Sequence, residues 1–281
     1  MNVNNIYNYD CLKDCKLIPK GIVDLVVTSP PYANMVSYGN KVNVKKPSDY
    51  PDWILPLFKE AENFLSDTGS FILNINDRVV KGERATYSMR TVINILDNTN
   101  LKLYDRYIWY KQNGLPSTGN KRLNDRVEYI YHFVKDTKKF KTNTDLIRIP
   151  YSDVSINRFK YDIYGSNTTD DDGKVKRRKK SSAPNPKGTK PTTVFKFQTA
   201  GVLRGNKHPA PFHPELPEFF IKWLTDEGDL VFDPFAGSGT TLIKAKEMNR
   251  KYLGFEINKV YIDTIIKPRI DNCVNTKCKK E

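Results

Sequence analysis

The sequence predicts an α/β fold built on a doubly wound, mostly parallel sheet. Two short apolar runs near opposite ends of the 281-residue chain carry this prediction. Residues 22–27 (Ile-Val-Asp-Leu-Val-Val) and 230–232 (Leu-Val-Phe) are typical of strands buried in a parallel sheet. Each run leads directly into a loop rich in proline or glycine. Ligands bind beyond the carboxyl ends of parallel strands where the strand order reverses. We therefore expect these strands to be neighbours and their loops to share one crevice.

The loop after the first strand reads Thr28-Ser29-Pro30-Pro31-Tyr32. Neither proline has an N–H, and Pro30 favours an extended backbone at Ser29. The loop therefore presents a hydroxyl, bare carbonyl oxygens and one aromatic face, which suit a flat heterocycle with an exocyclic amine. Ser-Pro-Pro also occurs in many ordinary strand-ending turns, so this loop alone would be interpreted as such a turn.

The loop after the second strand, residues 233–241, reads Asp-Pro-Phe-Ala-Gly-Ser-Gly-Thr-Thr and precedes a run with helical spacing. A strand, a Gly-x-Gly turn and a helix together form a nucleotide-type site. A further strand at 251–256 ends in Glu256, 19 positions after Gly237, close to the roughly 20 expected for an acid that binds ribose hydroxyls. No lysine follows the glycines, which argues against a Walker phosphate loop, and the missing third glycine argues against a nicotinamide dinucleotide.

Apolar spacing and turn residues predict the remaining elements in order. We expect an irregular polar loop at 33–50, a helix at 51–66, a strand at 70–75, a charged loop at 76–86, a helix at 88–98, antiparallel strands at 103–111 and 127–134, and a helix from Leu216 to Leu224 that Gly228 ends.

From about residue 140 the periodicity fades. Residues 174–190 contain eight Lys or Arg and no acid, with Ser, Pro and Gly between them. This composition predicts a disordered, solvated loop in the free protein, and it equally fits an arm that neutralises phosphates when DNA binds. The nearby aromatic residues could pack a small subdomain: Phe159, Tyr161, Tyr164, Phe195 and Phe197.

The overall composition limits the class of protein. With 38% hydrophobic residues the chain can bury a full core, and it has neither a run long enough to span a membrane nor a signal peptide, so we expect a cytoplasmic protein. The net charge of +14 suits a polyanionic partner. The four cysteines lack a Cys-x-x-Cys spacing and only three histidines are present, so we expect free thiols and no metal site.

Together, the two loops resemble those of the S-adenosylmethionine-dependent DNA amino-methyltransferases. The order matches the permuted, beta-type group, in which the Ser/Asp-Pro-Pro-Tyr loop comes first and the cofactor loop last. Further segments resemble the family in the same order: 69–75, 108–111, 128–133, 208–212 and 215–216. The resemblance implies a Rossmann-like methyltransferase domain in two halves, 1–139 (catalytic) and 206–281 (cofactor-binding), separated by a partly disordered target-recognition insertion at 140–205.

The resemblance also implies the roles of individual residues. The catalytic residues would be Ser29, Pro30, Pro31 and Tyr32. Asp233, Gly237 and Gly239 would contact the methionine end of the cofactor, Glu256 the ribose and Asp10 the adenine; Phe212 could equally serve packing. The full cofactor set is Asp10, Thr28, His208, Phe212, Asp233, Pro234, Phe235, Ala236, Gly237, Ser238, Gly239, Thr240 and Glu256. The DNA-binding residues are predicted from the basic composition of the run after 173, not from the resemblance: Lys174, Lys176, Arg177, Arg178, Lys179 and Lys180.

The expected reaction is direct methyl transfer to an exocyclic amine of a base flipped out of double-stranded DNA. In the family, Ser at the position of Ser29 goes mostly with N4 of cytosine, and Asp or Asn mostly with N6 of adenine, so we favour cytosine. Alternatives are N6-adenine methylation, an inactive DNA-binding module, and methylation of RNA or a protein glutamine. The resemblance further implies a prokaryotic or phage restriction–modification context with a companion endonuclease.

Overall fold

The computed structural model describes residues 1–33, 46–113, 121–159, 168–169, 175–176, 184–197 and 213–277. The chain divides into two compact units. One consists of Met1–Asn143 and Thr193–Glu281, and the other of Thr144–Thr192.

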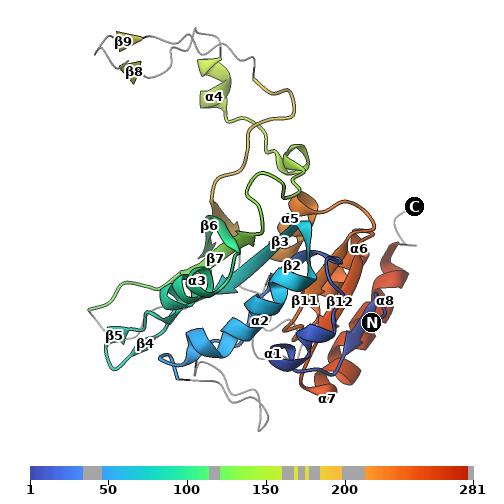
Figure 1. Cartoon of the computed structure of the whole chain (residues 1–281). Coiled ribbons are helices and arrows are strands. Elements are labelled where there is room, and N and C mark those ends of the chain that lie inside the picture. Colours follow the sequence, from blue (N-terminus) through green and yellow to red (C-terminus); the bar gives the residue numbers. More distant parts are fainter. Residues whose placement is uncertain are drawn as a thin grey trace. The chain divides into compact units, whose positions relative to one another are not determined.

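The larger unit is built on an eight-stranded sheet (Figure 1). In spatial order its strands are β1 (Asn5–Tyr7), β12 (Lys251–Phe255), β11 (Leu230–Asp233), β2 (Val23–Thr28), β3 (Leu65–Ile75), β7 (Val127–Val134), β6 (Lys102–Lys111) and β10 (Val194–Phe197). Of these eight strands, β7 alone runs antiparallel to the others. The predicted α/β class and mostly parallel sheet are confirmed, and β2 lies beside β11 as expected.

Helices cover both faces of this sheet (Figure 1). One face carries α1 (Cys11–Asp14), a 3₁₀ turn (Cys15–Leu17), α2 (Tyr50–Phe64) and α3 (Tyr87–Asn98). The other carries α5 (Glu215–Leu224), α6 (Thr240–Glu247), a π-helical turn (Ile262–Ile266) and α8 (Lys267–Lys277), with α7 (Lys259–Tyr261) before that turn. Among the described residues no helix is long and apolar enough to cross a membrane.

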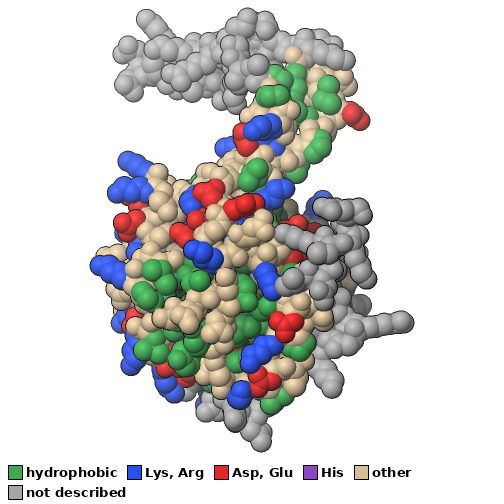
Figure 2. Space-filling view, turned by 90° about the vertical axis from the view of Figure 1, so that its right-hand side faces the viewer, with side chains coloured by type: hydrophobic (Ala, Val, Ile, Leu, Met, Phe, Trp, Pro, Cys, Tyr) green, Lys and Arg blue, Asp and Glu red, His purple; other side chains and the backbone are tan. Residues whose placement is uncertain are grey.

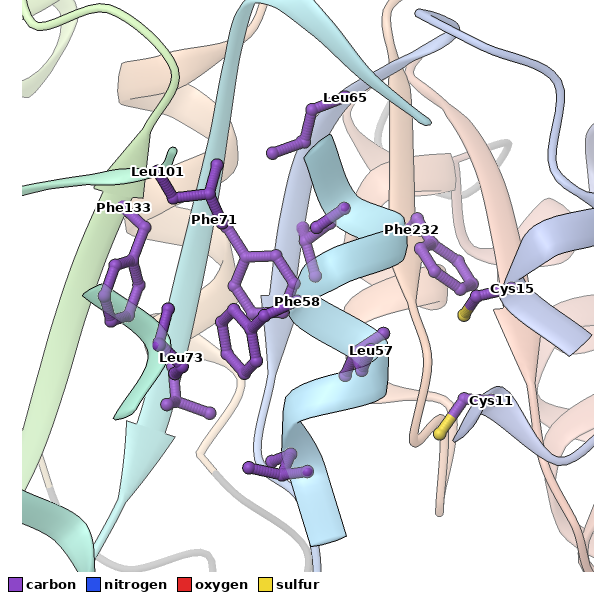
Figure 3. Packing of buried hydrophobic residues seen from close by; sticks show 14 of the residues in the cluster. Cys11, Cys15, Leu57, Phe58, Leu65, Phe71, Leu73, Leu101, Phe133 and Phe232 are labelled. Carbon is purple, nitrogen blue, oxygen red and sulfur yellow. The ribbon is translucent and has the colours of Figure 1, made fainter. Parts of the chain in front are cut away.

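Successive residues of the central strands alternate between the two faces, as the period of two in a strand requires. Val26 packs with the α2 side, whereas Leu25 and Val27 pack with the α5 side. On the α2 side, Phe58 lies against Phe71 and Phe133, with ring centroids 4.5 and 5.5 Å apart (Figure 3). The sheet is thus buried on both faces, so ligand access is left to its edges.

The same cluster contains two of the cysteines, Cys11 and Cys15 (Figure 3). Both are free and buried. Burial raises the pKa of each thiol, so both stay protonated at neutral pH. They act as small apolar side chains in the core.

Two local predictions differ from the structure. The charged loop at 76–86 contains a hairpin of β4 (Val79–Val80) and β5 (Glu83–Arg84), turned by Lys81 and Gly82 at φ 50° and 86°. The prediction that Gly228 ends the helix is wrong, since α5 ends at Leu224. The helix stops there because Thr225 adopts an extended backbone (φ −140°, ψ 156°), and its carbonyl accepts from Arg250 (2.7 Å) and Asn143 (3.0 Å) instead of from the next helical turn.

The smaller unit contains a 3₁₀ turn (Thr144–Ile147), α4 (Asp153–Arg158), β8 (Thr168–Thr169) and β9 (Val175–Lys176). Asp145 pairs with Arg148 at 2.7 Å and with Lys187 at 3.1 Å. Its range is narrower than the predicted insertion at 140–205, because Val194–Phe197 pairs with β6 in the main sheet. Phe195, expected in a recognition subdomain, packs instead against Tyr107 of the core, with ring centroids 5.7 Å apart.

The net charge of +14 is not gathered into a basic surface on the face shown in Figure 2. On this face the Lys and Arg side chains of the described residues are interspersed with Asp and Glu. The sequence places the densest run of Lys and Arg at 174–180, most of which lies outside the described residues.

Candidate active site

Four neighbouring parallel strands end at one edge of the sheet, and the predicted site residues follow them. β1 leads to Asp10, β12 to Glu256, β11 ends at Asp233 and β2 leads to Ser29. Asn8 ties two of these strand ends together, because its Nδ2 donates to the backbone oxygens of Glu256 and Ile257, each at 2.9 Å. Residues from the two termini of the chain therefore share one edge.

The two loops are joined directly by a buried hydrogen bond. Thr28 Oγ1, in the residue before Ser29, donates to Asp233 Oδ1 over 2.7 Å. Thr28 and Asp233 are both fully buried. The two loops, which the sequence predicted to be neighbours, are thus linked between residues 205 positions apart.

Asp233 carries a buried oxygen without a partner. Oδ1 accepts from Thr28 and from the Phe235 N–H at 3.1 Å, whereas Oδ2 accepts no hydrogen bond. Burial raises the pKa of this carboxyl to about 6, and the interactions with Thr28, Thr241 and the Phe235 N–H offset part of the effect. Buried polar atoms almost always have a hydrogen-bond partner, so this oxygen needs a donor that the protein does not supply. The primary ammonium of an amino acid fits that need, as the methionine end of S-adenosylmethionine requires.

The turn at 237–239 depends on its glycines. Gly237 and Gly239 adopt φ 54° and 76°, in the left-handed region. A Cβ on Gly239 would come 2.6 Å from Ile266 Cγ2 of the π-helical turn. Arg269 of α8 donates to the Ser238 carbonyl from the same direction. The C-terminal segment therefore packs closely against the back of this turn.

The missing third glycine of the dinucleotide pattern has a counterpart on the neighbouring strand. A Cβ on Gly254 of β12 would come 2.5 Å from Leu242 Cδ1 of α6. In dinucleotide-binding proteins the third glycine allows the helix to approach the strand closely. Here the strand supplies that glycine, and the helix contributes a leucine.

Glu256 is engaged by the protein itself, a role that the sequence did not reveal. Its Oε2 accepts from the Gly237 N–H at 2.9 Å, and its Oε1 from the Asn258 N–H at 2.8 Å. It is buried, and burial raises the pKa of its carboxyl. Glu256 thus braces the glycine turn, and each oxygen keeps a further lone pair with which to accept a hydroxyl.

The other predicted cofactor residues lie around these groups. Pro234, Ala236, Ser238 and Thr240 are buried, and the Phe235 ring lies 6.0 Å from that of Trp53. Asp10 caps α1 by accepting from the Leu12 N–H at 3.1 Å. His208 and Phe212 lie outside the described residues.

The catalytic loop is held by side chains from β3 and β7. Ser29 Oγ donates to Tyr32 Oη at 3.3 Å, and Tyr32 Oη donates to Glu128 Oε2 at 2.6 Å. Asn74 Nδ2 lies among all three, at 3.3 Å from Ser29 Oγ, 2.9 Å from Tyr32 Oη and 2.8 Å from Glu128 Oε2. Pro30 is buried and Pro31 partly so. Ser29 and Tyr32 are thus brought together, as the sequence predicted.

Tyr32 stays neutral in this setting. Burial raises the pKa of its hydroxyl well above the usual value, and the charge of Glu128 adds to the effect. A neutral phenol donates one hydrogen bond and accepts others. Tyr32 can therefore receive from Ser29 while donating to Glu128.

Three residues of this network were missed by the sequence reasoning: Asn74, Glu128 and Lys111, whose Nζ lies 3.1 Å from Glu128 Oε1. A usable signal existed at Glu128. Glu128 is the one carboxylate in β7, a strand made mostly of apolar and aromatic residues, and a carboxylate in such a strand needs a buried partner or a function.

The predicted DNA contacts fall almost entirely outside the described residues. Lys174 and residues 177–180 lie there, and of Lys176 only its backbone position in β9 is described. Within the part of the chain that the structure describes, no group of three or more His, Cys, Asp or Glu could hold a metal ion.

Known proteins are similar to this chain in sequence and in fold. Residues 23–267 match the family model for N6/N4 DNA methylases. The chain is 30% identical to Type II methyltransferase M.PvuII of Proteus hauseri, over 96% of this chain and 85% of that protein. It superposes on the PvuII DNA methyltransferase (cytosine-N4-specific) with a TM-score of 0.68 and 24% identity, covering 100% and 94% of the two chains.

A second solved structure is TTHA0409 of Thermus thermophilus, a putative DNA modification methylase complexed with S-adenosyl-L-methionine. Its TM-score is 0.64 at 21% identity, over 96% of this chain and 94% of that one. The family model covers most of the chain, including both loops and every strand of the sheet except β1. The chain therefore belongs to the N6/N4 family of DNA methyltransferases.

Proposed function

We propose that this protein transfers a methyl group from S-adenosylmethionine to the N4 amine of a cytosine flipped out of double-stranded DNA. The observation that carries the proposal is the hydrogen bond from Thr28 to Asp233. It couples the loop that would hold the base to the loop that would hold the cofactor. Two reactants held together in this way react with much of the entropic cost removed.

The proposed cofactor fits the residues at the strand ends. Asp233 Oδ2 would accept from the methionine ammonium, since it is buried without a partner. Glu256 would accept from a ribose hydroxyl with its remaining lone pairs, and Asp10 would lie near the adenine. The complex of TTHA0409 with S-adenosyl-L-methionine supports the same cofactor for this chain.

When bound, S-adenosylmethionine supplies an electrophilic methyl group. The residues of this chain orient the nucleophile. Ser29 Oγ and the Pro30 carbonyl would accept the two N–H groups of the target amine, drawing its nitrogen towards a tetrahedral geometry in which the lone pair is free to attack. Tyr32 would stack on the flipped base. The methylated nitrogen then loses a proton, which passes to solvent.

Cytosine is favoured over adenine by two observations. First, residue 29 is a serine, and in the family a serine at this position goes mostly with methylation of N4 of cytosine. Second, the similar PvuII DNA methyltransferase is named as cytosine-N4-specific. N6-adenine methylation is the second candidate, because the family includes both activities. The names of the curated relatives also favour a restriction–modification context with a companion endonuclease.

The test is incubation of the purified protein with S-adenosylmethionine and plasmid DNA from a host that lacks DNA methylases, followed by nucleoside mass spectrometry. N4-methylcytosine is the expected product, and an RNA substrate is the control. If N6-methyladenine were the only product, the proposed target base would be adenine instead of cytosine, and the proposed mechanism of methyl transfer would stand. No methylated nucleoside would refute the proposal and favour an inactive DNA-binding module.

A further inference from the structure

We propose that Glu128 is a positioning residue that sets the direction of the hydrogen bonds through the catalytic loop, so that Ser29 Oγ meets the target amine as an acceptor. The inference rests on the proposed function and deepens it. It is carried by the contacts among Ser29, Tyr32, Asn74, Glu128 and Lys111.

Glu128 lies at one end of the hydrogen-bond network, and its carboxylate can only accept hydrogen bonds. Its Oε1 receives from Lys111 Nζ at 3.1 Å, and the side chains of Lys111 and Glu128 are only 16% and 12% exposed. An ionised carboxylate has no proton to donate, and an ammonium has no lone pair to offer. With Lys111 occupying Oε1, the groups that face Oε2 must therefore act as donors.

Asn74 supports the same direction from the other side. Its Nδ2 lies 2.8 Å from Glu128 Oε2, and the residue is 1% exposed. Turning the amide over would place Oδ1 against the carboxylate, acceptor against acceptor. The amide NH₂ therefore faces the network, with Nδ2 2.9 Å from Tyr32 Oη and 3.3 Å from Ser29 Oγ.

The direction then follows along the chain of hydroxyls. Tyr32 must donate its single proton to Glu128, over 2.6 Å, so its oxygen is left to accept. Ser29 donates its own proton to that oxygen at 3.3 Å. The side of Ser29 Oγ that is left for a ligand therefore carries a lone pair.

This polarity decides whether Ser29 helps or hinders the reaction. An acceptor at Ser29 binds an amine N–H and leaves the nitrogen lone pair free. With the opposite polarity, Ser29 would donate to that lone pair and occupy the electrons needed for attack on the methyl group. Glu128 thus acts on the amine through Tyr32 and Ser29, without touching it.

Glu128→Gln tests the direction without changing the size of the side chain. If the new amide turns its oxygen to Tyr32 and Asn74, its NH₂ faces the Lys111 ammonium. If it turns its NH₂ inward, that group faces the Asn74 NH₂. Either orientation sets donor against donor at a buried site. We expect kcat to fall about tenfold or more, with little change in affinity for S-adenosylmethionine.

A second substitution should restore the direction. In Glu128→Gln with Lys111→Met, the amide NH₂ no longer faces an ammonium, so the amide oxygen can accept from Tyr32 and Asn74. We expect this double variant to recover at least half of the lost activity on a logarithmic scale. Lys102→Met at the exposed other end of β6 is the matched control, and it should not rescue Glu128→Gln.

The readout is single-turnover uptake of labelled methyl groups by unmethylated plasmid DNA, with calorimetry of cofactor binding and thermal melting for every variant. Wild type without uptake would refute the proposed function itself. Active wild type with Glu128→Gln within twofold of it would overturn the inference. So would a double variant as impaired as the single one, and so would equal rescue by Lys102→Met. The predicted result is that Lys111→Met restores activity to Glu128→Gln and Lys102→Met does not.

Discussion

The cofactor loop and the catalytic loop meet at one edge of the sheet, yet they are held in different ways. The cofactor loop is fixed mainly through its backbone: Glu256 binds the Gly237 N–H and Ile266 packs against Gly239. The catalytic loop is fixed through its side chains, which Asn74 and Glu128 reach from 42 and 96 positions along the chain from Tyr32. The contacts of the first loop lie within the C-terminal segment 233–269, whereas those of the second join strands that are far apart in the sequence.

The two kinds of contact suit two different tasks. A backbone cradle serves recognition of an invariant cofactor, because its shape depends little on side-chain rotamers. A side-chain network serves orientation of hydrogen bonds, because hydroxyl and amide groups can be arranged as donors or acceptors. Changes in the first loop should therefore alter cofactor binding, and changes in the second should alter turnover.

The largest effect is expected from Ser29→Ala. Loss of the oxygen that accepts the amine N–H should lower kcat about 100-fold or more, as for other positioned groups that act in the transition state. Single-turnover uptake of labelled methyl groups by DNA measures it. Ser48→Ala, at an exposed serine before α2, is the control. A Ser29→Ala enzyme that kept a third of wild-type activity would contradict the role of the catalytic loop.

The second prediction uses the buried carboxyl of the cofactor loop. The folded pKa of Asp233 is about 6, above the ordinary value of 3.8. The folded state therefore binds more protons between these values, and this contribution to stability is lost as pH rises from about 4 to about 6. Asp233→Asn should remove that slope and stabilise the cofactor-free protein at pH 7 by about 3 kcal/mol. Urea unfolding at pH 4.5 and 7 measures both quantities; an unchanged slope would contradict it.

A pair of glycines sharpens the comparison further. Gly228 and Gly239 both adopt left-handed backbone, at φ 85° and 76°, but a Cβ meets open space at Gly228 and Ile266 at Gly239. Alanine should cost about 1 kcal/mol at Gly228 and about 1–3 kcal/mol more at Gly239 because of the crowding. Thermal or urea unfolding gives both values. Equal costs would show that Ile266 moves aside easily.

The smallest effect on cofactor binding and on turnover is expected from changes in the basic run at 174–180. Replacing Arg177, Arg178, Lys179 and Lys180 by neutral residues should flatten the salt dependence of duplex binding by up to roughly four units of slope. Cofactor affinity and the methylated sequence should not change, because phosphate contacts do not read bases. Filter binding at several salt concentrations measures the slope. An unchanged slope would make this run a solvated loop, and an altered target sequence would place it among base-reading residues.

Much of the fold was predictable because its signals are local. The apolar runs at 22–27 and 230–232, the Pro-Pro and Gly-x-Gly loops after them, and the acid at 256 each follow from a few neighbouring residues. The parallel pairing of β2 with β11 then followed from the rule that such loops meet at a reversal of strand order.

What the sequence did not show depends on contacts between distant segments. Glu128 reaches Tyr32 only because β7 runs antiparallel beside β3, where Tyr129 pairs with Ile75. The end of α5 was misplaced because the Thr225 carbonyl finds partners in Arg250 and Asn143, one after and one far before it in the chain. The brace from Glu256 to Gly237 also needed the register of β11 and β12.

The division between the two loops is tested most directly by calorimetric titration of S-adenosylmethionine into wild type, Ser29→Ala and Asp233→Asn at pH 7.5. Ser29→Ala should bind the cofactor as wild type does. Asp233→Asn should bind at least tenfold more weakly, about 1.4 kcal/mol, because the buried acceptor for the ammonium has lost its charge. Equal weakening in both variants, or none in Asp233→Asn, would contradict the account.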